Sequence, residues 1–219
     1  MKSIKFDSAK PTDAPVVGDI PADLREAAAK SRHELLEGVA ECNDALMEKY
    51  IHDQEPTEEE LRQGIRNATS KHGVVPVLCG AAFRTIGIQP LLDAICHYLP
   101  SPLDISIPAA HNPHTEEAIS CTPDERAPLA ALAFKIMADA YVGKLTFIRV
   151  YSGTLKPGET VYNATKRRRE RISKVMRMHA NKQEMVDEIR AGDIGAGVGL
   201  KETTTGDTLC QESQQLVFE

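Results

Sequence analysis

The chain has 219 residues, of which 42% are hydrophobic and 26% charged, so it can form one large domain or two smaller ones with apolar cores. No apolar run approaches the roughly 20 residues that span a bilayer, and the first residues show no export-signal pattern. The five cysteines are odd in number and irregularly spaced, which argues against a disulfide framework. We therefore exclude secreted, collagenous and membrane-spanning classes and expect a cytoplasmic protein.

The formal net charge of −6 is unevenly distributed. Residues 1–125 carry 11 Lys/Arg against 21 Asp/Glu (−10), whereas residues 126–219 carry 15 against 11 (+4), which together give −6. Such a change of sign favours two domains with different partners. Acidic solvated helix faces in the first half would produce the same asymmetry, so charge alone does not decide between the two interpretations.

The first half of the chain is predicted to be helical, with one short strand. Apolar residues at helical spacing predict an amphipathic helix over about 21–51, and Thr57 with Glu60 has the spacing of a capping box that opens a second helix. The apolar run Val74–Cys79 predicts a short buried strand, and a last helix is expected over 88–99. This order is typical of an α/β layer. The residues expected to face inward from the last helix are Leu91, Leu92, Ile95 and Tyr98.

The second half of the chain is predicted to be all-β. Prolines recur from Pro102 to Pro128, which predicts a connector over 103–126. Beyond it the apolar period changes to two, and Lys156–Glu159 matches a type II turn. Seven short strands without a helix favour a barrel or a sandwich. The expected strands cover residues 131–136, 145–151, 161–162, 171–179, 185–189, 194–200 and 208–210.

Several chemical motifs are missing from the sequence. It contains no Gly-x-x-x-x-Gly-Lys-Ser/Thr, the loop that cradles nucleotide phosphates, and we assign no catalytic residue. Gly195–Gly199 has the wrong spacing for a dinucleotide loop and favours strands that pack closely. His111 and His114 lack the partner ligands of a structural zinc site, so no metal is expected.

One short segment is strongly basic. Within the twelve residues 166–177 there are seven positive charges and one negative charge, and this density favours binding of a nucleic-acid backbone. No aromatic residues are interleaved with the charges, so stacking of bases is not predicted there. The alternative is a solvated segment paired with acidic groups of the protein. The candidate nucleic-acid-binding residues are Lys166, Arg167, Arg168, Arg169, Arg171, Lys174 and Arg177.

Two sets of short segments follow one another along nearly the whole chain. The first set is Val77–Phe83, Gly87–Asp93 and Tyr98–Pro102; the second is Ala133–Ile136, Gly143–Phe147, Arg149–Gly153, Met178–Lys182, Ala191–Ile194 and Thr205–Cys210. Both sets resemble segments of bacterial translation elongation factor G and keep that family's order. The first set resembles the end of the family's GTP-binding domain, the acidic helix at 21–51 resembles the insertion subdomain within it, and the second set resembles the family's second domain.

The resemblance implies a fold and a domain division. It implies part of an α/β GTP-binding domain with its insertion subdomain over 1–102, a linker over 103–126, and an all-β translation-factor barrel over 127–219. The guanine-recognition loop would be Gly80, Ala81, Ala82 and Phe83. The family usually has Ser at the position of Ala81, so a hydroxyl is lost there while a backbone N–H donor is kept.

The resemblance also implies a function. The intact protein would be a ribosome-dependent GTPase that promotes tRNA–mRNA translocation and binds GTP or GDP with Mg²⁺, whereas this piece is expected to be inactive and to hold no nucleotide. The barrel would contact small-subunit ribosomal RNA, and the acidic insertion would contact the stalk proteins of the large subunit. A monomer is expected. The alternatives are a non-catalytic ribosome-binding or RNA-binding module and a related ribosomal protection or release-associated GTPase.

Overall fold

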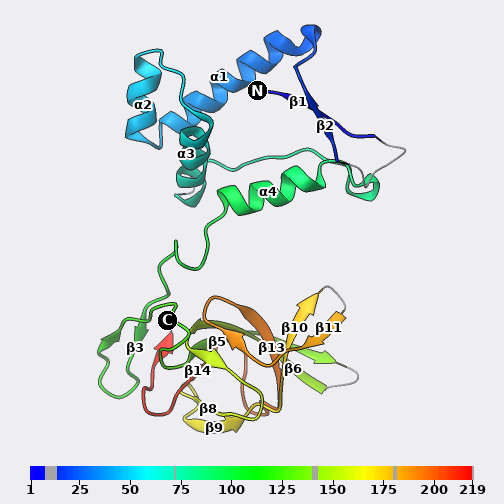
Figure 1. The fold of residues 1–219 in the computed structure, drawn as a ribbon. Coiled ribbons are helices and arrows are strands. Elements are labelled where there is room, and N and C mark those ends of the chain that lie inside the picture. The colour runs from blue at the N-terminus through cyan, green and yellow to red at the C-terminus, as the bar shows by residue number, and fades with distance from the viewer. Residues whose placement is uncertain (8–13, 72, 140–142, 180–181, 219) are drawn as a thin grey trace. The chain divides into compact units, whose positions relative to one another are not determined.

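The computed structural model describes residues 1–7, 14–71, 73–139, 143–179 and 182–218. The chain divides into two compact units, Met1–Pro100 and Ser101–Glu219 (Figure 1). The first unit contains the helices and the second is built from strands. In the part of the chain described here, no helix is both long and apolar enough to cross a membrane.

The helices of the first unit are shorter than its periodicity predicts. The expected helix over 21–51 is wrong as a single element, because Asn43 adopts an extended conformation and its side chain accepts a hydrogen bond from the Leu46 N–H at 3.2 Å. Asparagine is a strong N-cap, so it begins a new helix. The capping box between Thr57 and Glu60 is confirmed. The elements are β1 (Ser3–Lys5), β2 (Val16–Gly18), a 3₁₀ turn (Ala22–Leu24), α1 (Arg25–Ala40), α2 (Asp44–Ile51), α3 (Glu58–Ser70), a second 3₁₀ turn (Ala82–Arg84) and α4 (Ile88–Tyr98).

Helices α1, α2 and α3 share a small core that contains Val39, Leu46 and Ile65. Gly64 makes this packing possible, because a Cβ at that position would lie 2.2 Å from Leu46 Cδ1 and 2.8 Å from Val39 Cγ1. The Arg66 guanidinium donates to the carbonyl oxygen of His97 at 3.1 Å and so ties α3 to the end of α4. The helices of the first unit therefore have a core of their own.

The predicted buried strand at Val74–Cys79 is wrong. The segment is extended but pairs with no described strand, and Val75 and Val77 are 82% and 85% exposed. A parallel or central strand is buried only when neighbouring strands and covering helices flank it, and no described strand lies beside this segment. The inward orientation expected on α4 is also wrong for Leu91, Leu92 and Ile95, which are 40%, 56% and 45% exposed. The first unit thus keeps an uncovered apolar surface.

The second unit is dominated by an eight-stranded antiparallel sheet in the order β11-β10-β13-β6-β5-β14-β8-β9. The sheet curls round an apolar core that includes Ile148, Val175 and Leu209. After β9 the Ser173 N–H donates to Val198 O at 2.7 Å, which brings the chain beside β13 and closes the curve. The strands are β5 (Ala130–Asp139), β6 (Gly143–Ser152), β7 (Thr154–Leu155), β8 (Thr160–Asn163), β9 (Arg168–Arg171), β10 (Lys174–His179), β11 (Lys182–Met185), β12 (Ile189–Arg190), β13 (Ile194–Val198) and β14 (Thr208–Cys210).

The strands of the second unit agree with the period-two pattern, but two details differ from the prediction. The segment 103–126, expected as a linker, carries β3 (Ala110–His111) and β4 (Ala118–Ile119), and β3 also pairs with β15 (Val217–Phe218). A second apolar cluster of this unit includes Ala110, Cys210 and Phe218. Ile107 and Cys121 pack against it, so apolar residues between the prolines anchor the segment to the barrel. The strand expected over 185–189 is wrong, because β11 ends at Met185, the chain bends at Asp187, and a separate strand β12 begins at Ile189.

Two glycines of the barrel distinguish the energetic cost of a left-handed backbone from the cost of a steric clash. Gly199 has φ +107° and its added Cβ would lie 2.7 Å from Arg171 O, whereas Gly206 has φ +94° with nothing within 4 Å. Gly206→Ala should cost about 1–2 kcal/mol from the left-handed backbone alone. Gly199→Ala should cost about 1–3 kcal/mol more, because a backbone oxygen must move. Urea denaturation of both variants measures the difference; equal losses would show that the contact with Arg171 is not rigid.

Candidate functional site

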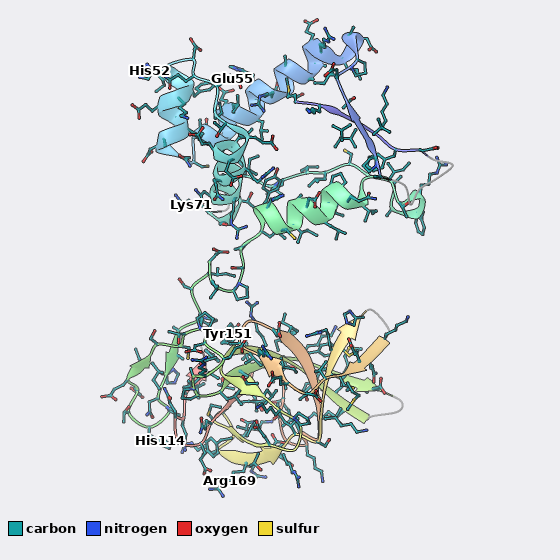
Figure 2. All side chains as sticks on the ribbon, viewed as in Figure 1. His52, Glu55, Lys71, His114, Tyr151 and Arg169 are labelled. Atoms are coloured by element: carbon teal, nitrogen blue, oxygen red, sulfur yellow. The ribbon has the colours of Figure 1, made fainter. Side chains whose placement is uncertain are left out.

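The basic residues of 166–177 do not form one surface. Lys166 and Arg167 lie in the turn after β8, and three arginines follow on β9, an edge strand of the sheet. Lys174 and Arg177 lie on β10, which stands near the other end of the strand order. Figure 2 shows Arg169 at the rim of the barrel, on β9. The seven basic residues therefore have different surroundings.

The arginines of β9 are largely matched by neighbouring acceptors. Arg169 forms a bidentate pair with Glu212, at 2.8 Å from Nε and 2.7 Å from Nη2, and the hydrogen bond and charge of Glu212 raise the pKa of Arg169. Arg168 lies 3.9 Å from a Glu202 carboxylate oxygen, and Arg171 Nε donates to Gly158 O at 3.1 Å. The alternative of a solvated segment paired with acidic groups thus describes this part of the cluster well.

Lys166 belongs to a polar clamp beneath the surface, made of Asn163, Lys166, Glu170, Thr203 and Asp207. Asn163 Nδ2 donates to Asp207 Oδ2 at 2.9 Å and to Thr203 Oγ1 at 3.2 Å. The Lys166 ammonium lies 3.4 Å from Asp207 Oδ2. Asn163 and Thr203 are fully buried, so these bonds replace water contacts that the polar groups cannot otherwise make.

Glu170 is the one acidic residue within the basic run, and it points into the clamp. It is 8% exposed, accepts the backbone N–H of Glu202 at 2.8 Å and accepts the hydroxyl of Thr203. Asp207 accepts the Thr204 N–H at 2.8 Å. Together these bonds fix the loop between β13 and β14, so the clamp is a structural device and not a free anion-binding site.

Burial opposes ionisation of Asp207, but hydrogen bonds from Asn163 and Thr204 and the charge of Lys166 outweigh it and lower the pKa of Asp207 below its ordinary value of 3.8. The carboxylate therefore remains charged at neutral pH and holds both the Lys166 ammonium and the Thr204 amide.

Three members of the cluster remain open for a partner. Within the described residues, Arg167, Lys174 and Arg177 form no ion pair and all three are exposed. Arg167 has φ +56°, a left-handed conformation that directs the chain through the turn between β8 and β9. Among the other four sequence candidates, Arg171 also forms no ion pair with a described residue, but its Nε donates to Gly158 O, whereas Lys166, Arg168 and Arg169 are each paired with a carboxylate.

The second candidate site is the loop that contains Gly80–Phe83. Its ends are joined by the Ala81 N–H to Ile86 O at 2.9 Å and the Ile86 N–H to Ala81 O at 3.2 Å. A Cβ on Gly80 would lie 2.9 Å from Ile86 O, which explains the glycine at this close approach. The loop is therefore a closed, well-defined turn ahead of α4.

The loop contains backbone hydrogen-bond donors without an intrahelical acceptor. In its 3₁₀ turn the first N–H with an intrahelical acceptor is that of Arg84, which bonds Ala81 O at 2.9 Å. The N–H groups of Ala82 and Phe83 precede it and have no intrahelical partner, as at any helix start. Both residues are exposed. Such amides can donate to a carbonyl oxygen of a base.

Sequence reasoning missed the clamp partners Asn163, Thr203 and Asp207, and it counted Lys166 as a nucleic-acid contact. A signal was present in Glu170, a lone acidic residue inside a dense basic run. Such a residue is typical of internal charge pairing. The partners come from β8, β9 and the β13–β14 loop, and their convergence follows only from the strand order.

Comparison with known proteins finds a match to one family model and matches to solved structures. Residues 143–210 match the family model of elongation factor Tu domain 2. A crystal structure of a protein from Thermus thermophilus matches with a TM-score of 0.70 and 26% sequence identity, over 98% of this chain and 29% of that chain. This chain therefore spans less than a third of the length of that protein. The two matches support kinship with translational GTPases and do not separate elongation factor G from its relatives.

The clamp predicts a pH dependence of stability. A carboxylate with a depressed folded pKa stabilises the fold above its unfolded pKa, and the contribution is lost as pH falls through the folded pKa. Asp207→Asn should lower the unfolding free energy by about 1–3 kcal/mol at pH 7 and flatten the loss of stability below about pH 4. Urea titrations across pH measure this.

The matched control is Glu212→Gln, which removes the exposed partner of Arg169 and should change the unfolding free energy by less than about 1 kcal/mol. Equal effects of the two substitutions would contradict a special role for the buried clamp.

Proposed function

We propose that the chain is part of a ribosome-dependent translational GTPase of the elongation factor G type, which promotes movement of tRNA and mRNA through the ribosome. The observation that carries the proposal is the match of residues 143–210 to elongation factor Tu domain 2, in a chain that aligns over 98% of its length with a single longer protein. The elongation factor G assignment is supported by the segments Val77–Phe83, Gly87–Asp93 and Tyr98–Pro102, which resemble that family.

Within such a protein this chain would position and dock, and it would not hydrolyse GTP. Its sequence contains no phosphate-binding loop, so GTP or GDP with Mg²⁺ would be held mainly by other parts of the intact protein. The closed loop at Gly80–Phe83 would contribute backbone donors at the guanine, and the change to Ala81 removes only a hydroxyl. We assign the intact protein to the cytoplasm, where ribosomes are.

The two units would contact different ribosomal components. The barrel offers Arg167, Lys174 and Arg177 to ribosomal RNA, whose backbone attracts such unpaired cations. The helical region 22–60 carries 12 Asp/Glu against 4 Lys/Arg, which suits basic stalk proteins of the large subunit. The departure at Ala81 favours one second candidate, a specialised relative such as a ribosomal protection or release-associated GTPase.

The proposal predicts competition for the factor-binding site of the ribosome. Added to ribosomes, the chain should sediment with them at low salt and should inhibit GTP hydrolysis by full-length elongation factor G competitively. By itself it should hydrolyse no GTP. Increasing salt from about 50 to 200 mM should release it, because phosphate contacts dominate its binding. Failure to sediment at low salt, or inhibition that excess full-length factor does not overcome, would count against the proposal.

A further inference from the structure

The helical unit contains a cavity of about 410 Å³, bounded by α1, α2 and the segment that joins α2 to α3. Its volume lies in the range of small-molecule sites, about 300–1,000 Å³. The side chains that line it divide by chemistry into an apolar and a polar set. The apolar set is Leu36, Leu46, Tyr50, Ile51 and Pro56; the polar set is His33, Asp53, Gln54 and Glu55.

Polar contacts between α1 and the chain after it hold the walls of this cavity in place. The Arg32 guanidinium donates to Glu55 Oε2 at 3.2 Å and so ties α1 to the segment that follows α2. Figure 2 shows Glu55 near the end of α2. His33 Nε2 and the Tyr50 hydroxyl lie 3.2 Å apart, at hydrogen-bond distance. Beneath them Leu46 is buried in the helical core. The cavity therefore has a defined shape.

Asp53 lies at the polar side of the cavity, directly after the end of α2. The Asp53 N–H donates to Tyr50 O at 3.2 Å and the Gln54 N–H donates to Lys49 O at 2.8 Å, the two bonds of a Schellman motif. Glycine usually occupies the left-handed position of this motif, but here Asp53 adopts it with φ +51°. Its carboxylate also lies beside the negative end of the helix dipole. The backbone and the dipole thus both disfavour aspartate here.

The cations nearest in the fold are already paired with other carboxylates. Lys49, in the last turn of α2, lies 2.6 Å from Glu60 Oε1, and Arg32 is paired with Glu55. Within the described residues, the Asp53 carboxylate forms neither an ion pair nor a hydrogen bond. The cavity therefore combines an apolar lining with a negative charge that the protein does not neutralise.

This combination selects an organic cation. A divalent metal ion such as Ca²⁺ takes six to eight oxygen ligands, and the described part of the chain has no group of three or more His, Cys, Asp or Glu that could hold a metal. An alkylammonium ion needs fewer acceptors, and its methylene groups can pack on Leu36 and Pro56. An ammonium can also lie against an aromatic face such as that of Tyr50.

We propose that the cavity binds a small alkyl polyamine. One ammonium would pair with Asp53 at the end of α2, and the methylene chain would pack on Leu36, Leu46 and Pro56. A lysine of a protein partner is disfavoured, because lysine is depleted from protein interfaces. The inference goes beyond the proposed ribosomal function and does not depend on it, since every contact that carries it lies within the helical unit.

The test uses spermidine as the probe and the full chain as the protein, with isothermal titration calorimetry at constant ionic strength. We expect saturable binding of one spermidine per chain. Asp53→Gly removes the carboxylate and supplies the residue that the Schellman motif prefers, so it should not lower the thermal midpoint. It should weaken spermidine binding about fivefold, the effect of one unit charge at contact distance in water. Asp53→Asn also tolerates the left-handed backbone and gives a second reading.

The matched control is Glu48→Gln, which removes the same charge from the same helix. Glu48 is exposed, does not line the cavity and forms no ion pair with a described residue, so spermidine affinity should stay unchanged. Equal losses in the Asp53 and Glu48 variants would overturn the inference, because they would indicate general attraction of a polycation to an acidic helix.

Competition experiments test the apolar lining. Butylamine should displace spermidine at several-fold lower concentration than methylamine, because each buried methylene contributes about fourfold in affinity. Equal potency of the two amines, or displacement by Mg²⁺ as effective as that by butylamine, would overturn the inference. So would a chain that binds a lysine-rich peptide but no spermidine. Sedimentation with ribosomes is a separate measurement, so failure of either proposal leaves the other standing.

Discussion

The organisation of the barrel surface depends on one buried carboxylate. Glu170 lies inside a basic run yet points inward, where it accepts the Glu202 amide and the Thr203 hydroxyl. A buried carboxylate is tolerated only with such partners, because desolvation of an unpaired charge is expensive. Its side chain therefore ties β9 to the β13–β14 loop. Asn163, Lys166 and Asp207 complete the clamp from the neighbouring elements. The arginines beside Glu170 are then left at an edge strand, within reach of Glu202 and Glu212.

This arrangement determines which positive charges of the barrel can contact a partner. Residues 166–177 have the highest density of positive charge in the sequence. Only those cations that are not paired with carboxylates of the protein are available to an external partner. The clamp and the β9 pairs use Lys166, Arg168 and Arg169, whereas Lys174 remains open on β10. Lys135, which lies far away in the sequence, joins Lys174 on the same face because β13 and β6 stand between their strands. The surroundings of a charged residue are therefore set by strand order and not by its neighbours in the sequence.

Local patterns predicted much of the fold and less of the site. The capping box at Thr57, the proline-glycine turn at Gly158 and the period-two strands depend on neighbouring residues, and the structure confirms them. Burial was predicted less well, because it depends on what covers a segment. Val75 and Val77 have the composition of a buried strand, yet no described strand flanks them, and they are exposed. The clamp could not be predicted for the same reason, since its members meet only through the strand order.

Strand β6 illustrates a further limit of predicting structure from periodicity. In Leu145–Tyr151 five of seven residues are apolar or aromatic and they occur on both faces, so the pattern predicts a strand but does not show which face meets water. An antiparallel strand that is apolar on both faces must bury or use its second face. In β6 the first face fills the barrel with Ile148 and Val150, and the second buries Leu145 in a separate cluster with Met176 and Ala196. Apolar composition on both faces of a strand thus indicates that the strand contributes to two separate apolar clusters, and strand register decides which residues complete the second one.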